Sequence, residues 1–319
     1  MRPLADEILA PINAHTARPE STQTVASFLE HVYMPHIRES KKPSTAKGYL
    51  DMYRLVEPHL NGTELREART SDIDRFLKAV ADSKPRAHTT LLNVKSFLSG
   101  AFRYAKRTDL INQNPVHDSV VPRGLPKGKT PAYTLQEIQK LLAAIPEPAK
   151  TAVLVAGLTG LRVSEIKGLR WEDVIGDELL VQRSVWWGKV TDTKTLTSRA
   201  PVPLLPLVKR ALLQHRKLST GDGYIFHGRT GKPLRLENSV RRDIKPAIAE
   251  AGLQWYGWHA FRRGVSTNLH ALGADDKTIS DILRHSDVSI TQQHYIKPVA
   301  AKSSKAMRKL EAAFKRAKR

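Results

Sequence analysis

Residues 159–165 read Thr-Gly-Leu-Arg-Val-Ser-Glu and follow an apolar run over 151–158. The run predicts a largely buried helix that ends at Gly160. A short helix over 163–169 would then begin after Arg162, where backbone N–H groups and a guanidinium can converge on one anion. Glu165 lies three residues further on, on the side of this helix from which it can orient Arg162. On its own, the motif also fits an ordinary surface ion pair.

Three further polar clusters follow along the chain. His259 and Arg262 are spaced so that a helix would place a proton-transfer group and a phosphate-binding group on one face. His285 precedes a polar turn, and Tyr295 follows ten residues later. Lys194 lies in a Thr-Lys-Thr segment that we expect on a hairpin loop. Each cluster alone also fits a structural role, such as a half-buried histidine or a packed tyrosine.

Taken together, the clusters are far more specific. The chain resembles the tyrosine recombinases, the phage-integrase-like site-specific recombinases, from about Thr24 to Tyr295. The resemblance rests on the flanking sequences Thr-Gly-Leu-Arg-x-Ser-Glu and Leu-x-His-Ser and on six residue types in the family's catalytic order, namely Arg162, Lys194, His259, Arg262, His285 and Tyr295. It implies a mostly α fold with a small β-sheet (α+β), in which a helical SAM-like core-binding domain precedes a mixed α/β catalytic domain.

The resemblance also implies a role for each site residue. Tyr295 would attack the scissile phosphate and form a 3′-phosphotyrosyl link. The two guanidinium groups, those of Arg162 and Arg262, would bind the non-bridging oxygens without a metal. Lys194 would protonate the departing 5′-oxygen. Glu165 would support Arg162.

The two histidines would complete this set. His259 would assist proton transfer from the tyrosine, and His285 would donate a hydrogen bond to a phosphate oxygen. No cofactor is needed, because the phosphotyrosine conserves the bond energy. Lys189 is an alternative general acid, but Lys194 is preferred because it lies past the turn at 187–189.

The chain departs from the family pattern in two places. Arg284 stands where the family usually has glycine before the second histidine, and we expect it to add a phosphate contact. Larger phage members carry a separate arm-binding domain at the N-terminus, and we do not expect residues 1–22 to form one.

Composition supports a nucleic-acid partner. The 319 residues include 52 Lys and Arg against 31 Asp and Glu, a formal net charge of +21, which favours a polyanion. The hydrophobic content of 40% is sufficient for a buried core, and the absence of cysteine excludes disulfides and thiolate chemistry. No apolar run is long enough to span a bilayer, so we expect a cytoplasmic, nucleoid-associated protein of bacterial or phage origin.

The organisation along the chain predicts five segments. In the first domain, helices are expected to begin at Thr24, Ser44, Ser71 and Lys84, and a capping box at Thr134 begins the second domain. Strands are expected over 179–187 and 199–204. The segments are an N-terminal tail 1–22, a core-binding domain 23–118, a basic Pro/Gly linker 119–132, a catalytic domain 133–297 and a basic C-terminal helix or tail 298–319.

Basic side chains outside the catalytic set are candidate DNA contacts. For any single one, a solvated surface is the alternative. The candidates are Lys41, Lys42, Lys47, Arg86, Lys95, Arg103, Lys127, Lys129, Arg263 and Arg284.

The function predicted from the sequence is that of a site-specific recombinase or integrase of a mobile genetic element. It would act on double-stranded DNA as a homotetramer, with accessory DNA-bending or excision factors as further partners. The alternatives are a type IB topoisomerase-like relaxing enzyme and a catalytically silent DNA-binding regulator on the same fold. A metal-dependent nuclease is disfavoured, because no ligand cluster has metal-site spacing.

Overall fold

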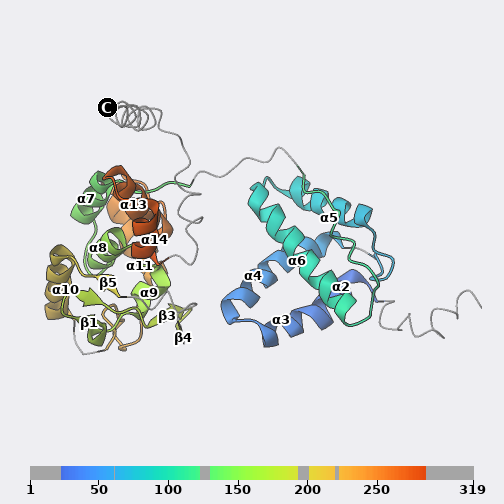
Figure 1. Cartoon of the computed structure of the whole chain (residues 1–319), viewed down its shortest axis with the longest axis horizontal. Helices are drawn as coiled ribbons and strands as arrows, with labels where there is room; N and C mark the ends of the chain where they lie inside the picture. The colour runs from blue at the N-terminus through green and yellow to red at the C-terminus, as the bar shows by residue number, and fades with distance from the viewer. Residues whose placement is uncertain (1–22, 61, 123–129, 193–200, 220–222, 285–319) are drawn as a thin grey trace, which may run out of the picture. The chain divides into compact units, whose positions relative to one another are not determined.

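A computed structural model describes residues 23–60, 62–122, 130–192, 201–219 and 223–284. The chain divides into two compact units, Met1–Lys129 and Thr130–Arg319. The boundary between them falls inside the stretch 119–132 that the sequence predicts as a linker. The described part of the first unit is helical, and the second unit combines helices with short strands (Figure 1).

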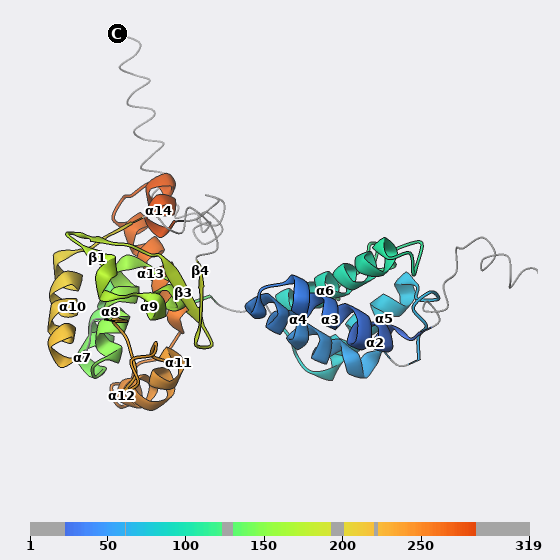
Figure 2. The ribbon, with the colours of Figure 1, turned by 90° about the horizontal axis from the view of Figure 1, so that it is seen from below.

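The described residues of the first unit form four helical segments around one apolar core. The first segment is continuous but passes through a π-helical turn. The elements are α2 (Val25–Phe28), η2 (Leu29–Tyr33), α3 (Met34–Ser40), α4 (Pro43–Val56), η3 (Glu57–His59), α5 (Thr70–Ser83) and α6 (His88–Arg107). The core lies where α4 and α5 pack on α6, and the rings of Phe28, Phe76 and Phe102 are fully buried in it. Figure 2 shows α6 along one side of this unit.

Proline sets two helix starts that the sequence predicts a few residues away. We expected Ser44 to cap α4, but the helix begins at Pro43, because proline is well suited to the first helical position. The helix expected from Lys84 begins at His88 instead. Pro85 disfavours helical backbone at the residue before it, which delays α6.

The second unit packs helices around small antiparallel sheets. Its elements are α7 (Leu135–Ala144), α8 (Ala149–Thr159), α9 (Val163–Gly168), η4 (Trp171–Asp173), β1 (Val174–Ile175), β2 (Glu178–Leu179), β3 (Arg183–Trp186), β4 (Lys189–Asp192), β5 (Val202–Pro203), α10 (Pro206–Leu218), α11 (Leu236–Ser239), η6 (Val240–Ile244), α12 (Lys245–Glu250), α13 (Trp258–Ala271) and α14 (Asp276–Leu283).

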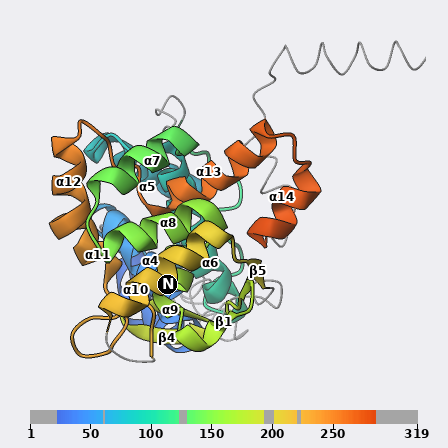
Figure 3. The same ribbon diagram turned by 90° about the vertical axis from the view of Figure 1, so that its left-hand side faces the viewer.

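Helix α8 is the centre of this unit. It lies among α7, α9, α10 and α13 and contacts each of them (Figure 3). Nearly all of its residues are buried. The apolar run 151–158 therefore is the buried helix that the sequence predicts. The capping box ahead of α7 is also confirmed, because the Glu137 amide donates to Thr134 Oγ1 at 3.2 Å and the Thr134 amide donates to Glu137 Oε2 at 2.8 Å.

The strand prediction over 179–187 is wrong in one respect. The segment forms two strands in different sheets: β2 lies between β1 and β5, whereas β3 pairs with β4 in a second sheet. The chain leaves the first sheet at Leu180, whose amide donates to the Asp173 carbonyl, and β3 then packs against α9. Trp187 and Gly188, both with positive φ, form the two-residue turn to β4.

Lys189 therefore lies on a strand, opposite Trp186.

Within the described residues, no helix is both long and apolar enough to cross a membrane.

Candidate active site

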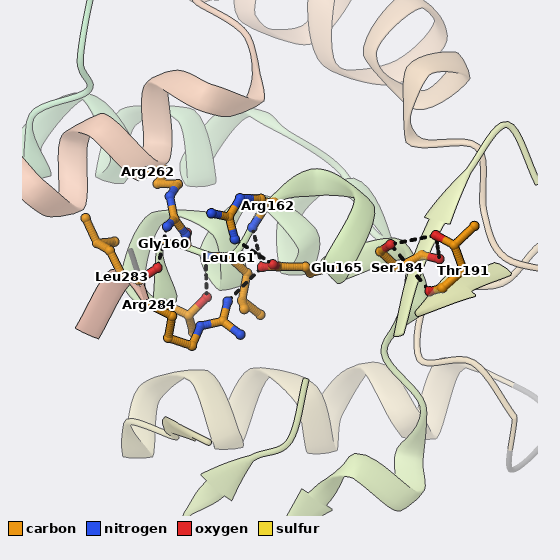
Figure 4. Close-up of polar contacts among 10 residues, drawn as sticks. Gly160, Leu161, Arg162, Glu165, Ser184, Thr191, Arg262, Leu283 and Arg284 are labelled. Atoms are coloured by element: carbon orange, nitrogen blue, oxygen red, sulfur yellow. Dashed lines mark hydrogen bonds and ion pairs between the residues drawn. The ribbon is translucent and has the colours of Figure 1, made fainter. Parts of the chain in front are cut away.

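Arg162 and Glu165 meet at the start of α9, as the sequence predicts. Glu165 Oε2 accepts a hydrogen bond from the Arg162 amide at 2.9 Å, and Oε1 accepts one from Arg162 Nη1 at 2.9 Å (Figure 4). The Glu165 side chain is 4% exposed, whereas the Arg162 side chain is 35% exposed. The carboxylate thus holds one edge of the guanidinium while part of Arg162 stays accessible to an anion.

Arg262 approaches the same place from α13. Its Nη1 donates to the Gly160 carbonyl at 2.7 Å, its Nη2 donates to the Leu283 carbonyl, and the residue is 7% exposed. It therefore joins two segments that lie far apart in the sequence (Figure 4). The two arginines predicted to bind one phosphate are brought together by the turn at Gly160.

Gly160 is required at this turn for two reasons. Its φ of +66° lies in the left-handed region, where a side chain is strained. A Cβ there would also lie 2.5 Å from Leu283 Cδ2. The close approach of α8 to the end of α14 thus depends on glycine.

Arg284 turns its side chain into the protein interior. Its side chain is 2% exposed, and its Nη2 donates to Glu165 Oε2 at 2.7 Å. The charge of Arg284 is therefore balanced by a carboxylate, whereas among the described residues that of Arg262 meets only backbone carbonyls, and this pairing argues against the DNA contact expected from the sequence. The residue has φ +56°, which accounts for the glycine usual at this position in the family.

The local charges shift several pKa values. Burial alone would raise the pKa of Glu165, but Arg284 and then Arg162 outweigh it and hold that pKa below its usual value. Burial and then the charge of Arg162 lower the pKa of Arg262 to about 9. Arg262 still carries a positive charge at neutral pH.

His259 lies at the beginning of α13, three residues before Arg262 on the same helix face. The pKa of His259 is lowered first by partial shielding from solvent and then by the charges of Arg263, Arg262 and Arg162. The lowered pKa favours the neutral imidazole, which can accept a proton. The rings of Trp255 and Trp258, which precede His259 in the sequence, lie 5.4 Å apart in an edge-on arrangement.

Arg263 has a role that the sequence did not reveal. Its Nε donates to the Pro131 carbonyl at 2.8 Å, and the Tyr133 amide donates to the Ala260 carbonyl. Asn268 donates to the Tyr133 carbonyl at 3.1 Å. The beginning of the second unit is thus fastened along α13, and Arg263 contributes to this rather than presenting an unengaged side chain to DNA.

The remaining predicted residues fall into two groups. Lys194, His285, Tyr295, Lys127 and Lys129 lie outside the described residues. In the first unit, Lys41, Lys42 and Arg103 are exposed. Lys47 pairs with Asp51, Arg86 donates to the Val80 carbonyl, and Lys95 donates to the carbonyls of His117 and Ser119.

Metal-ligand geometry is not found in the described part of the chain, where no group of three or more His, Asp or Glu side chains could hold a metal ion.

Comparisons with known proteins bear on the identity of the chain. Residues 132–302 match the model of the phage integrase family. The chain belongs to the phage integrase family. It is similar to a tyrosine recombinase XerC-like protein of Caldanaerobacter subterraneus subsp. tengcongensis, with 27% identity over 87% of this chain and 80% of the relative. It is also 30% identical to an integrase of Streptomyces ambofaciens over 76% of this chain and 68% of the relative.

Solved structures of integrases share the fold. The integrase of the transposon Tn1549, in complex with a circular intermediate DNA, has a TM-score of 0.75 at 22% identity, over 90% of this chain and 99% of that one. A lambda integrase tetramer bound to a Holliday junction has a TM-score of 0.67 at 21% identity, over 88% and 81%. The family member described here is a tyrosine-type site-specific recombinase, and neither a topoisomerase-like enzyme nor a silent regulator is favoured.

Proposed function

We propose that this recombinase cuts and rejoins double-stranded DNA with Tyr295 as nucleophile and Arg162 and Arg262 as the phosphate clamp. The observation that carries the proposal is the convergence of these two arginines, from α9 and α13, around the turn at Gly160. Two fixed guanidinium groups can stabilise the charge of a pentacoordinate phosphate without a metal.

The proposed reaction is a transesterification. The Tyr295 oxygen bonds to phosphorus, the bond to the 5′-oxygen breaks, and a 3′-phosphotyrosyl link results. Neutral His259 takes the phenol proton, Lys194 protonates the leaving 5′-oxygen, and His285 donates a hydrogen bond to the phosphate. Attack by a second strand's 5′-hydroxyl reverses the step and religates the DNA, so no cofactor is consumed.

The proposed assembly is a homotetramer on DNA. The tetramer of lambda integrase on a Holliday junction supports this. We assign segment 298–319 to a contact with the neighbouring protomer and the exposed Lys41, Lys42 and Arg103 to the DNA backbone. Accessory DNA-bending or excision factors would add directionality, and the bacterial relatives support a cytoplasmic, nucleoid-associated enzyme.

The nucleophile is tested by covalent trapping. The full chain is mixed, without metal, with nicked duplexes that tile the DNA on either side of its own coding sequence. We expect a protein–DNA adduct that survives denaturing electrophoresis and is absent with Tyr295→Phe. No adduct with the unsubstituted chain, or an adduct that persists in Tyr295→Phe, would overturn the proposal.

A further inference from the structure

Arg284 combines a strained backbone with a buried charge. Among the described residues other than glycine, three have positive φ: Asp109, Trp187 and Arg284. The first two are exposed, whereas the Arg284 side chain is 2% exposed. An arginine in the left-handed region costs more than the glycine usual there, so its side chain is expected to supply a compensating interaction.

That interaction is with Glu165. Arg284 Nη2 and the Arg162 amide both donate to Oε2, at 2.7 and 2.9 Å, which leaves Oε1 for Arg162 Nη1 (Figure 4). The carboxylate is therefore held at one oxygen and presents the other to the guanidinium of Arg162. The pair joins the end of α14 to the beginning of α9, 119 residues apart in sequence.

The pair also changes the charge that a phosphate would meet. Arg162, Arg262 and Arg284 face the single carboxylate of Glu165, with partly shielded His259 neutral beside them. Without Arg284, the buried carboxylate would have Arg162 as its one direct ion-pair partner among the described residues, and it would compete with the phosphate for that guanidinium.

We propose that Arg284 is a positioning residue that holds Glu165 and so keeps Arg162 oriented for the scissile phosphate. The inference rests on the proposed function, because it takes Arg162 as a phosphate-binding group. Arg284 itself does not touch DNA in this arrangement.

The first test separates binding from chemistry. Binding of Arg284→Met to a fluorescent 30-base-pair duplex is measured by anisotropy at several salt concentrations, and its cleavage rate is measured on the nicked duplex at saturating protein. We expect cleavage to slow by about 10–100-fold, the usual loss when a residue supporting a site ligand is removed. Affinity should stay within about twofold, and the slope of log K against log salt should not change.

A direct phosphate contact would give the opposite pattern. Binding would weaken, and the salt slope would fall by about 0.9 for one lost contact. That result would overturn the proposal, as would wild-type cleavage by Arg284→Met. The matched control is Lys277→Met, which removes one positive charge from an exposed side chain of the same helix and should leave binding and cleavage within about twofold.

A double-mutant cycle tests whether Arg284 acts through Glu165. The double variant E165Q/R284M should cleave no more slowly than E165Q, because no charged carboxylate remains to be held. If the double variant instead lost cleavage rate by the product of the two single-variant losses, the proposal would be contradicted. Arg284→Lys, which keeps the positive charge, should recover part of the cleavage rate that Arg284→Met loses.

Folding is controlled with Arg284→Gly. This variant loses the same ion pair as Arg284→Met but relieves the positive φ, so it should fold at least as well as Arg284→Met and cleave as slowly. Wild-type cleavage by Arg284→Gly refutes the positioning role. Absence of an adduct with the unsubstituted chain instead refutes the proposed function, so the two failures are distinguishable.

Discussion

Gly160→Ala should destabilise the second unit more than its single added methyl suggests. A side chain at φ +66° costs about 1–2 kcal/mol. The new Cβ would also lie 2.5 Å from Leu283 Cδ2, and Leu283 is 1% exposed in a cluster with Val265 and Ile279, so it has little room to yield. Such overpacking costs about 1–3 kcal/mol. We expect the free energy of unfolding to fall by about 2–5 kcal/mol.

Tryptophan fluorescence during urea unfolding isolates this effect, because all five tryptophans lie between Trp171 and Trp258, inside the second unit. The matched control is Gly176→Ala. Gly176 has a similar φ of +59°, but no atom lies within 4 Å of the place that its new methyl group would take, so only the backbone cost of about 1–2 kcal/mol applies. If Gly160→Ala costs no more than Gly176→Ala, the close contact with Leu283 does not constrain the site.

Two further predictions use the same fluorescence assay. The pKa of Glu165 is lowered in the folded state, so its carboxylate contributes stability above the unfolded pKa of about 4.3, and this stability is lost as the pH falls toward the folded pKa. Glu165→Gln should therefore show a shallower decline in unfolding free energy below about pH 5 than the unsubstituted chain. Parallel curves of unfolding free energy against pH for the two proteins would contradict this. Lys167 is 6% exposed and pairs with Glu237, which is 62% exposed, so Glu237→Met should cost about 1–3 kcal/mol by leaving a buried ammonium without its carboxylate, whereas Lys167→Met should stay within about 1 kcal/mol. The reverse order would refute the reasoning.

Local signals in the sequence predict much of this molecule. The apolar run 151–158 and the glycine after it give α8 and its end, and the Thr134–Glu137 spacing gives the beginning of α7. The three-residue step from Arg162 to Glu165 gives their ion pair. These features depend on residues within one helical turn of each other, so they can be read without the tertiary fold.

Features that depend on distant segments are not predictable in this way. The sequence marks Arg284 as unusual, but only the folded chain brings it to Glu165. Likewise, the division of 179–187 into two strands follows from the packing of β3 against α9. A basic residue in a glycine position signals a special backbone, but only the fold shows that its side chain is buried against Glu165.

The two arginines of the candidate site are held by different means, and the difference bears on the reaction. Arg162 is held by a carboxylate, whose charge is shared with Arg284. Arg262 is held by the carbonyls of Gly160 and Leu283, which lie at the C-terminal ends of α8 and α14. Helix C-termini carry unsatisfied carbonyls and partial negative charge, so they stabilise a buried cation without neutralising it.

The charge of Arg262 therefore stays available to a phosphate even though the residue is buried. Arg162 is held by a full negative charge, that of Glu165, and Arg284 supplies the positive charge that offsets it. Both arrangements require α8 and α14 to end in left-handed residues, Gly160 and Arg284, at the same place. The positive charge at the site thus depends on how α8 and α14 end. The Gly160 substitution tests the end of α8, and the Arg284 substitutions test the end of α14.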